Sequence, residues 1–215
     1  MIYLAAQVVP GIVLRGKPLW PALLLGTVAL GGALLLQDCR TARDTLSITR
    51  NFYGVLRVVE GAVDTPFHGY RLNHGSTSHG LQFADPARSG LATTYYHEAS
   101  GVGVALNNFP RQANRRVGVV GLGAGTLAVY GRPGDTFRFY EIDPAVQRLA
   151  TTGFSFLKNS SARVEVIPGD ARLSLEQEPG QQFDLLVLDA FSSDAVPVHL
   201  LTREAFETYV RHLKP

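Results

Sequence analysis

Acidic residues follow three apolar runs in the second half of the chain. Glu141 ends "TFRFYE", Asp170 follows "RVEVIP", and Asp189 follows "FDLLVL". The carboxyl ends of parallel strands meet at one edge of a sheet, so we expect these acids on a single rim. Like charges gathered there raise one another's pKa and cost stability, which favours a binding or catalytic site. The alternative is that Asp170 and Asp189 each cap a helix.

A glycine-rich turn, "GLGAGT", precedes the first of these acids and carries Gly121, Gly123 and Gly125. Glycine lets the backbone turn tightly and lets a ligand approach closely. A helix expected to start near Thr126 would offer free N–H groups. Glu141 lies 20 residues after Gly121, and its carboxylate can accept hydrogen bonds from both hydroxyls of a ribose.

This pattern predicts nucleotide or nucleoside binding, with a plain tight turn and a solvated acid as the alternative. NAD and S-adenosylmethionine both fit the turn and Glu141. Asp170 can bond an adenine amino group, and Asp189 adds a further acid beyond it, so S-adenosylmethionine is favoured over NAD.

The bulk composition suits one globular domain with an additional segment. The chain has 215 residues, a net charge of +2 and 46% hydrophobic content. Such a small charge gives no argument for a nucleic-acid partner. The single Cys39 excludes an internal disulfide. His74 and His79, in "NHGSTSHG", lack a partner carboxylate, so we expect no metal site.

The additional segment is residues 1–37, which we interpret as a membrane segment. Residues 19–36 form an uncharged apolar run of 18 residues, about 27 Å long as a helix and near the thickness of a bilayer core. The alternative is a buried core helix or a misassigned start. Residues 2–14 resemble part of an earlier span. Arginines at 40, 43 and 50 slightly outweigh Arg15 and Lys17, which favours a cytosolic C-terminal domain.

Residue patterns typical of strands and turns divide residues 38–215 into two parts. We predict a linker and small β subdomain over 38–110, and over 111–215 a Rossmann-like domain of four strands alternating with helices. Asp143 and Pro144 predict the start of a helix running to about Leu157, and Thr202 predicts the cap of the last helix. The chain stops directly after that helix, so we expect further strands beyond Pro215, and truncation at both ends.

Several segments together resemble the spermidine synthase family, the polyamine aminopropyltransferases. They are "YYHE", "GLGAG", "YEID", "GDAR" and "LDAFSSDAVP", between Asn51 and the C-terminus. The spermidine synthase-like domain fused behind membrane helices is the most similar type. The resemblance implies a Rossmann-like fold of the S-adenosylmethionine-dependent transferases. It also implies decarboxylated S-adenosylmethionine as a co-substrate with no tightly bound cofactor, an amine such as putrescine as acceptor, and homo-oligomers.

The resemblance also implies residue roles. Asp189 matches the catalytic proton acceptor and Asp194 the second acid of the gate loop, while Tyr96 and His97 reach over the amine substrate. Glu141 matches the ribose ligand. The remaining matches correspond to residues that contact the cofactor in the family: Asp170, the adjoining Ala171, and Gln82. For His97 the alternative is an ordinary surface or core histidine.

Two departures from the family pattern bear on the substrate. Ala124 stands where the family's glycine turn carries an aspartate that holds the amino group of the donor. "DAFSSDAVP" has two extra residues between its aspartates. We therefore expect Ala124→Asp to improve use of the decarboxylated donor. The alternatives are an S-adenosylmethionine-dependent methyltransferase on the same fold, or a membrane protein that binds polyamine or nucleoside without catalysis.

Overall fold

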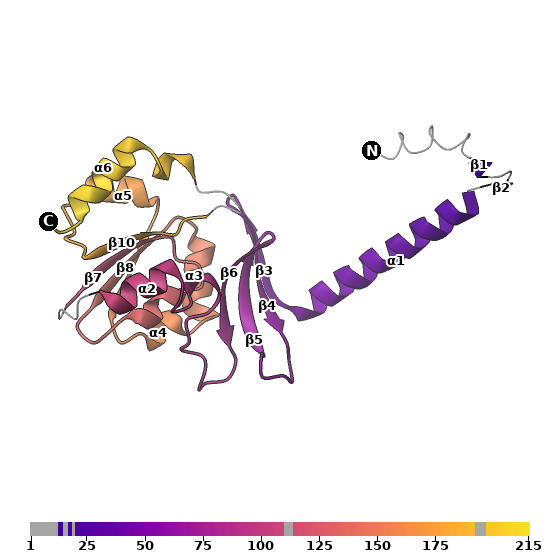
Figure 1. Ribbon diagram of the computed structural model, residues 1–215, viewed down its shortest axis with the longest axis horizontal. Coiled ribbons are helices and arrows are strands. Elements are labelled where there is room, and N and C mark those ends of the chain that lie inside the picture. The colour runs from indigo at the N-terminus through magenta and orange to yellow at the C-terminus, as the bar shows by residue number, and fades with distance from the viewer. Residues whose placement is uncertain (1–12, 15–16, 19, 110–113, 192–196) are drawn as a thin grey trace. The chain divides into compact units, whose positions relative to one another are not determined.

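The computed structural model describes residues 13–14, 17–18, 20–109, 114–191 and 197–215. The chain divides into two compact units, residues 1–44 and 45–215 (Figure 1). Each unit is described separately below.

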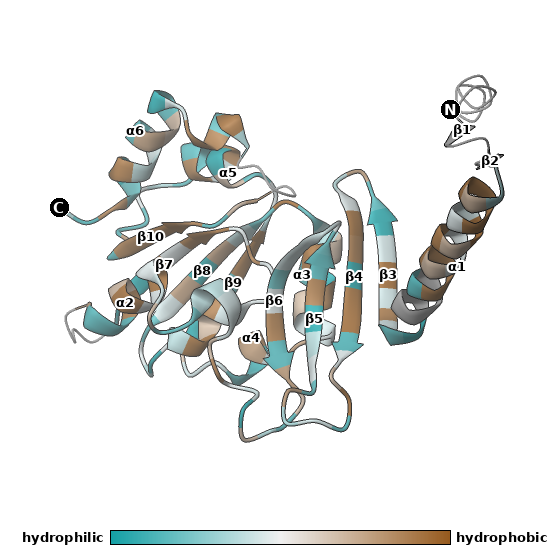
Figure 2. Ribbon diagram, turned by 45° about the vertical axis from the view of Figure 1, so that its right-hand side comes forward, coloured by the Kyte–Doolittle hydropathy of each residue, from teal (hydrophilic) through white to brown (hydrophobic). Residues whose placement is uncertain are grey.

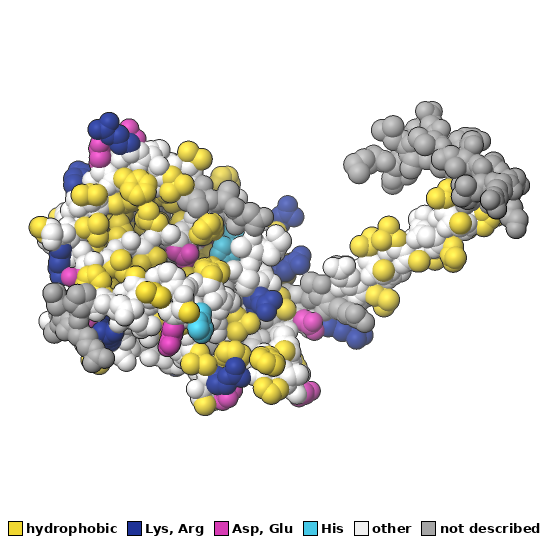
Figure 3. Space-filling model, viewed as in Figure 1, with side chains coloured by type: hydrophobic (Ala, Val, Ile, Leu, Met, Phe, Trp, Pro, Cys, Tyr) yellow, Lys and Arg dark blue, Asp and Glu magenta, His cyan; other side chains and the backbone are white. Residues whose placement is uncertain are grey.

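The first unit is dominated by one long helix, α1 (Trp20–Asp44), preceded by the short antiparallel strands β1 (Val13–Leu14) and β2 (Lys17–Pro18). Its window Trp20–Gln37 has a mean hydropathy of 1.6 with none of it buried, and is long and apolar enough to cross a membrane. Apolar side chains cover this helix in Figure 3. An N-terminal signal sequence has the same length and composition. The helix continues to Asp44 and so extends beyond the expected span.

The second unit begins with an antiparallel sheet in the order β3-β4-β5-β6. The strands are β3 (Thr45–Asn51), β4 (Gly54–Gly61), β5 (Gly69–His74) and β6 (Thr77–Phe83). β3 lies in the polar segment 38–51, at the start of the predicted linker and small β subdomain. It is an edge strand in which exposed and half-buried residues alternate, so few apolar residues mark it. After β6, the segment "TTYYHE" contains a 3₁₀ turn, η1 (Thr94–Tyr96), and α2 (Gly101–Asn108) follows.

A parallel sheet in the order β10-β7-β8-β9 confirms the predicted Rossmann-like α/β class (Figure 1). Its strands are β7 (Arg116–Val120), β8 (Thr136–Glu141), β9 (Arg163–Pro168) and β10 (Leu185–Leu188). The central strand β7 pairs in parallel with β8 and β10, with Val119 opposite both Phe139 and Val187. The carboxyl ends of these strands therefore lie at one edge.

Helices connect the parallel strands. Asp143 caps α3 (Pro144–Thr152) by accepting from the Ala145 N–H, and Thr202 caps α6 (Arg203–His212), both as predicted. The expected helix to Leu157 is interrupted at Gly153, and α4 (Phe156–Asn159) follows. The segment after the glycine turn is only a 3₁₀ helix, η2 (Thr126–Tyr130), because Gly131 and Pro133 follow it. The remaining helices are α5 (Ala171–Gln177) and η3 (Val198–Leu200).

Apolar side chains pack against both faces of the parallel sheet, and hydrophobic residues recur along β7 and β10 in Figure 2. Phe137 and Phe139 point to one face and join the larger cluster, which also includes Leu56 and Leu72 of the small sheet. Tyr140 points to the other face, where α5 and α6 cover it. The two sheets thus share one core, which holds the small sheet against the Rossmann-like part.

An ion pair is buried where β7 and β8 begin. The side chains of Arg115 and Asp135 are 1% and 2% exposed and meet at 2.6 Å. The remaining guanidinium N–H groups donate to the carbonyl oxygens of Leu106 and Tyr130, while Asp135 also accepts from the Arg132 N–H. These bonds satisfy both charges and tie α2 and η2 to the sheet.

We expect Asp135→Ala to lower the free energy of unfolding by about 3–5 kcal/mol, because it leaves a buried guanidinium without its counter-charge. Denaturant unfolding of the full chain in detergent measures this. Arg203→Ala is the matched control, because its partner Glu207 and Arg203 itself are 61% and 87% exposed. A loss as small as that of the control would show that the pair does not stabilise the domain.

Candidate active site

A cavity that is partly open to solvent lies at the carboxyl edge of the parallel sheet, with about 800 Å³ of empty space when the open solvent in its mouth is included. The glycine turn and the residues following β8, β9 and β10 line it on one side. The small sheet contributes further lining residues: Tyr53, Leu56, Leu72, His74 and His79.

The glycine turn is shaped by contacts that leave no room for side chains. Gly121 has φ +100°, and a Cβ there would lie 2.5 Å from the carbonyl oxygen of Asp189. Gly123 has φ +54°, and a Cβ there would lie 2.7 Å from the carbonyl oxygen of His79. Both glycines line the cavity. Gly125 is directed toward Leu157 and is not part of the lining described.

Glu141 is held by the backbone at the end of β8. Its two carboxylate oxygens accept from the N–H of Leu122 at 3.0 Å and of Asp143 at 2.8 Å. Burial raises the pKa of Glu141 to about 7, while these N–H groups act in the opposite direction. The carboxylate lines the cavity with its orientation set, as a ligand for ribose hydroxyls requires.

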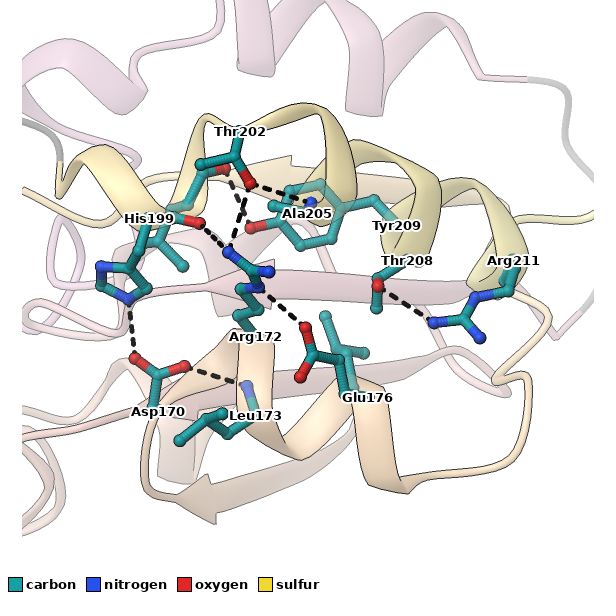
Figure 4. Close-up of polar contacts among 12 residues, drawn as sticks. Asp170, Arg172, Leu173, Glu176, His199, Thr202, Ala205, Thr208, Tyr209 and Arg211 are labelled. Atoms are coloured by element: carbon teal, nitrogen blue, oxygen red, sulfur yellow. Dashed lines mark hydrogen bonds and ion pairs between the residues drawn. The ribbon is translucent and has the colours of Figure 1, made fainter.

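Asp170 both caps a helix and faces the cavity (Figure 4). Its Oδ1 accepts from the Leu173 N–H at the start of α5, as the capping alternative predicted. Its Oδ2 lies 2.8 Å from Nε2 of His199 on η3. Arg172 binds the carbonyl oxygen of His199 at 2.9 Å and the hydroxyl of Thr202 at 3.2 Å, which fixes η3 beside α5. Ala171 also lines the cavity.

Asp189 follows β10 and reaches a residue from the N-terminal half of the unit. Its Oδ2 accepts from the hydroxyl of Tyr96 at 2.6 Å. Burial raises the pKa of Asp189 to about 6, and the Tyr96 bond acts in the opposite direction. Tyr96 is 3% exposed. Asp189 and Tyr96 are therefore brought together, whereas Asp194 lies outside the described residues.

Other predicted site residues lie elsewhere. His97 is exposed, and its Nδ1 accepts from the Ala99 N–H. The Gln82 amide is buried and bonds Ser89 and Ser155, so it ties β6 to the start of α4. Neither residue is among the cavity lining. Gln82 therefore packs β6 against the start of α4, and neither its predicted cofactor contact nor the predicted substrate contact of His97 is tested by these positions.

Ala124 is also placed differently from the expectation. It is fully buried, and a Cβ on Gly80 would lie 2.6 Å from its methyl carbon. Its N–H donates to the carbonyl oxygen of His79. An aspartate at 124 would press a carboxylate against β6 instead of reaching a ligand, so we no longer expect Ala124→Asp to improve donor use.

Some lining residues were not predicted. Ile142, between Glu141 and Asp143, offers an apolar surface that is 42% exposed. Among the described residues, Nε2 of His79 and Oδ2 of Asp143 are buried without a hydrogen-bond partner. The "YEID" motif contains two of these residues, but nothing in the sequence brings His79 near them. Over the same described ranges, no cluster of three His, Cys, Asp or Glu residues could hold a metal.

The raised pKa of Glu141 predicts a pH dependence of stability. A carboxyl whose pKa rises from 4.5 unfolded to about 7 folded favours folding below pH 4.5, and this advantage is lost as pH rises through 7. The free energy of unfolding of the wild type, minus that of Glu141→Gln, should therefore fall by about 3 kcal/mol between pH 4.5 and 8. Asp189 titrates in both proteins, so its contribution cancels in this difference. A pH-independent difference would contradict the shift.

Comparison with known proteins agrees with this architecture. No protein-family model matches the chain. Over 96 residues the chain is 35% identical to the polyamine aminopropyltransferase of Vibrio vulnificus, a match that covers 41% of the chain and 31% of that protein. The chain thus matches about a third of the length of this curated relative.

Solved structures share the fold. A probable spermidine synthase from Corynebacterium glutamicum superposes with a TM-score of 0.63 at 21% identity, over 79% of this chain and 60% of that one. The spermidine synthase of Thermotoga maritima gives 0.54 at 16% identity, over 80% and 53%. A spermidine synthase in complex with the transition-state analogue AdoDATO also gives 0.54, at 15% identity over 80% and 55%. The chain therefore shares the fold of these spermidine synthases.

Proposed function

We propose that this protein is an aminopropyltransferase. It would transfer the aminopropyl group of decarboxylated S-adenosylmethionine to an amine such as putrescine and release methylthioadenosine. The observation that carries the proposal is the half-buried Asp189, bonded to Tyr96, in the same cavity as Glu141. That cavity combines a base with a carboxylate suited to ribose.

The nucleoside of the donor fits the side of the cavity formed by β8 and β9. Glu141 accepts hydrogen bonds from the ribose hydroxyls, and Ile142 provides an apolar surface for the adenine ring. The adenine amino group donates to Asp170, where it shares or replaces the contact with His199. The donor is a co-substrate that leaves as methylthioadenosine, so no resident cofactor is required.

The base acts on the amine. A primary ammonium has a pKa near 10 and is not nucleophilic until it loses a proton. Asp189 takes that proton, the amine nitrogen attacks the propyl carbon next to the sulfonium, and the C–S bond breaks with its electron pair moving to sulfur. A base with a pKa of about 6 holds the proton more tightly than an ordinary aspartate. Tyr96 orients the carboxylate during the transfer.

The apolar helix α1 suits a membrane tether. The proposal therefore includes a membrane-bound enzyme with its catalytic domain on the cytosolic side, acting on small molecules. A homo-oligomer is part of the proposal by analogy with the relatives.

A second candidate function is an S-adenosylmethionine-dependent methyltransferase, because the glycine turn, residues 121–126, carries no carboxylate for the amino group of the decarboxylated donor. Calorimetric titration of the full chain with methylthioadenosine, S-adenosylmethionine and the decarboxylated donor distinguishes the two. Tighter binding of the decarboxylated donor supports aminopropyl transfer, and tighter binding of S-adenosylmethionine supports methyl transfer. Binding of none of the three would contradict both.

Asp189→Asn should lower the kcat of aminopropyl transfer by about 10²–10⁴-fold, because the amide cannot accept the ammonium proton. The Kd for methylthioadenosine should change by no more than about twofold, since Asp189 acts on the amine substrate. Glu207→Gln, which removes an exposed carboxylate of α6, is the control. Near wild-type turnover by Asp189→Asn would remove Asp189 from the proposed role.

Glu141→Ala should weaken methylthioadenosine binding by about 1–3 kcal/mol, or roughly 5- to 150-fold in Kd, through loss of charge-assisted hydrogen bonds to ribose. Calorimetry measures this, with Glu207→Ala as the control. An unchanged Kd in a folded Glu141→Ala protein would refute the ribose assignment.

A further inference from the structure

Three oxygen atoms form a chain from the candidate base toward solvent. Asp189 Oδ2 lies 2.6 Å from the hydroxyl oxygen of Tyr96, which lies 3.0 Å from that of Tyr95. Exposure increases from Tyr96, which is 3% exposed, to Tyr95, which is 45% exposed. The rings of the two tyrosines are in contact, with centroids 4.2 Å apart.

The number of protons on the three groups sets the direction of the hydrogen bonds between them. Each phenol carries one proton. When Asp189 is ionised, Tyr96 donates to it, and Tyr95 donates to Tyr96. When Asp189 is protonated, the chain can reverse, so that Asp189 donates to Tyr96, Tyr96 to Tyr95, and Tyr95 to water.

The proposed reaction needs such a route. Each turnover removes one proton from the ammonium, and Asp189 must lose it before it can act again. Tyr96 bonds one carboxylate oxygen of Asp189, and a ligand that filled the cavity would separate Asp189 from the solvent on the cavity side. A proton released into the occupied cavity would return to the amine product.

We infer that Tyr95 and Tyr96 relay the proton from Asp189 to solvent. This inference rests on the proposed function. Asp189 passes its proton to the Tyr96 oxygen as Tyr96 passes its own to Tyr95, and Tyr95 passes its own to water. The products are the Asp189 carboxylate, two intact phenols and a hydronium ion, so no charge remains on either ring. Tyr95 touches no reacting atom and acts through Tyr96.

The acid–base properties of the chain agree with concerted transfer. Burial raises the pKa of Tyr95 to about 12, with the Asp189 charge adding to it, and raises the pKa of Tyr96 further above its ordinary value. Neither phenol ionises near neutral pH, so both remain able to donate. The other titratable groups lining the cavity are His74, His79, Tyr53, Tyr140, Glu141, Asp143, Asp170 and His199.

The kinetic test is Tyr95→Phe, which removes one hydroxyl and keeps the ring against Tyr96. We expect kcat to fall about tenfold while KM for the donor and the amine is unchanged, because the relay is cut after binding. Added imidazole should restore the rate of the variant by carrying the proton, and should leave the wild type unaffected. Tyr70→Phe, on β5 and outside the cavity lining, is the control. An unchanged kcat, or a fall that imidazole does not restore, would overturn the relay.

A second measurement does not depend on turnover. The Tyr95 bond polarises the Tyr96 hydroxyl and so strengthens its bond to the Asp189 carboxylate. The pKa of Asp189, followed by NMR of ¹³C-labelled aspartate and assigned with Asp189→Asn, should rise in Tyr95→Phe and stay unchanged in Tyr70→Phe. An unchanged Asp189 titration in Tyr95→Phe would overturn the coupling. If the wild type transfers no aminopropyl group, the proposed function fails, and this titration still decides whether the three groups are coupled.

Discussion

The close approach of the glycine turn to the segment after β10 is the constraint on which the candidate site depends. A side chain at Gly121 would collide with the carbonyl oxygen of Asp189, so the two segments meet through backbone alone. This contact places Asp189 beside the loop whose Leu122 N–H orients Glu141. One turn thus positions both the candidate base and the ribose ligand, and a change at Gly121 would disturb both.

The small sheet completes the site from the opposite side. The carbonyl oxygen of His79 accepts from the Ala124 N–H, and the absence of side chains at Gly80 and Gly123 allows β6 to approach the turn. Leu56 and Leu72 continue the shared core into the cavity lining. The small sheet is therefore part of the site, and η1, which follows it in the chain, carries the tyrosines to Asp189.

The acidic side chains of the cavity are accommodated in two different ways. Glu141 is buried and Asp189 is half-buried, and each has a raised pKa that donors from backbone or phenol partly offset. Asp170 shares its charge between a helix N-terminus and an imidazole. Neutralising Glu141 or Asp189 costs little free energy in the empty cavity, whereas cationic substrates favour the ionised forms, so ligand binding and proton state are coupled.

Local sequence patterns predicted the parallel strands in their order along the chain, the caps at Asp143 and Thr202, and the acids at the ends of β8, β9 and β10. These features follow from hydrophobic periodicity and from residues that act on their own neighbours. The packing of distant segments was needed to show that Asp189 meets Tyr96, 93 positions earlier, that Gln82 packs against Ser155, and that Ala124 is enclosed by β6. The edge strand β3 was missed because an edge strand buries few apolar side chains. Contacts between distant segments depend on how the two sheets pack, which no local pattern encodes.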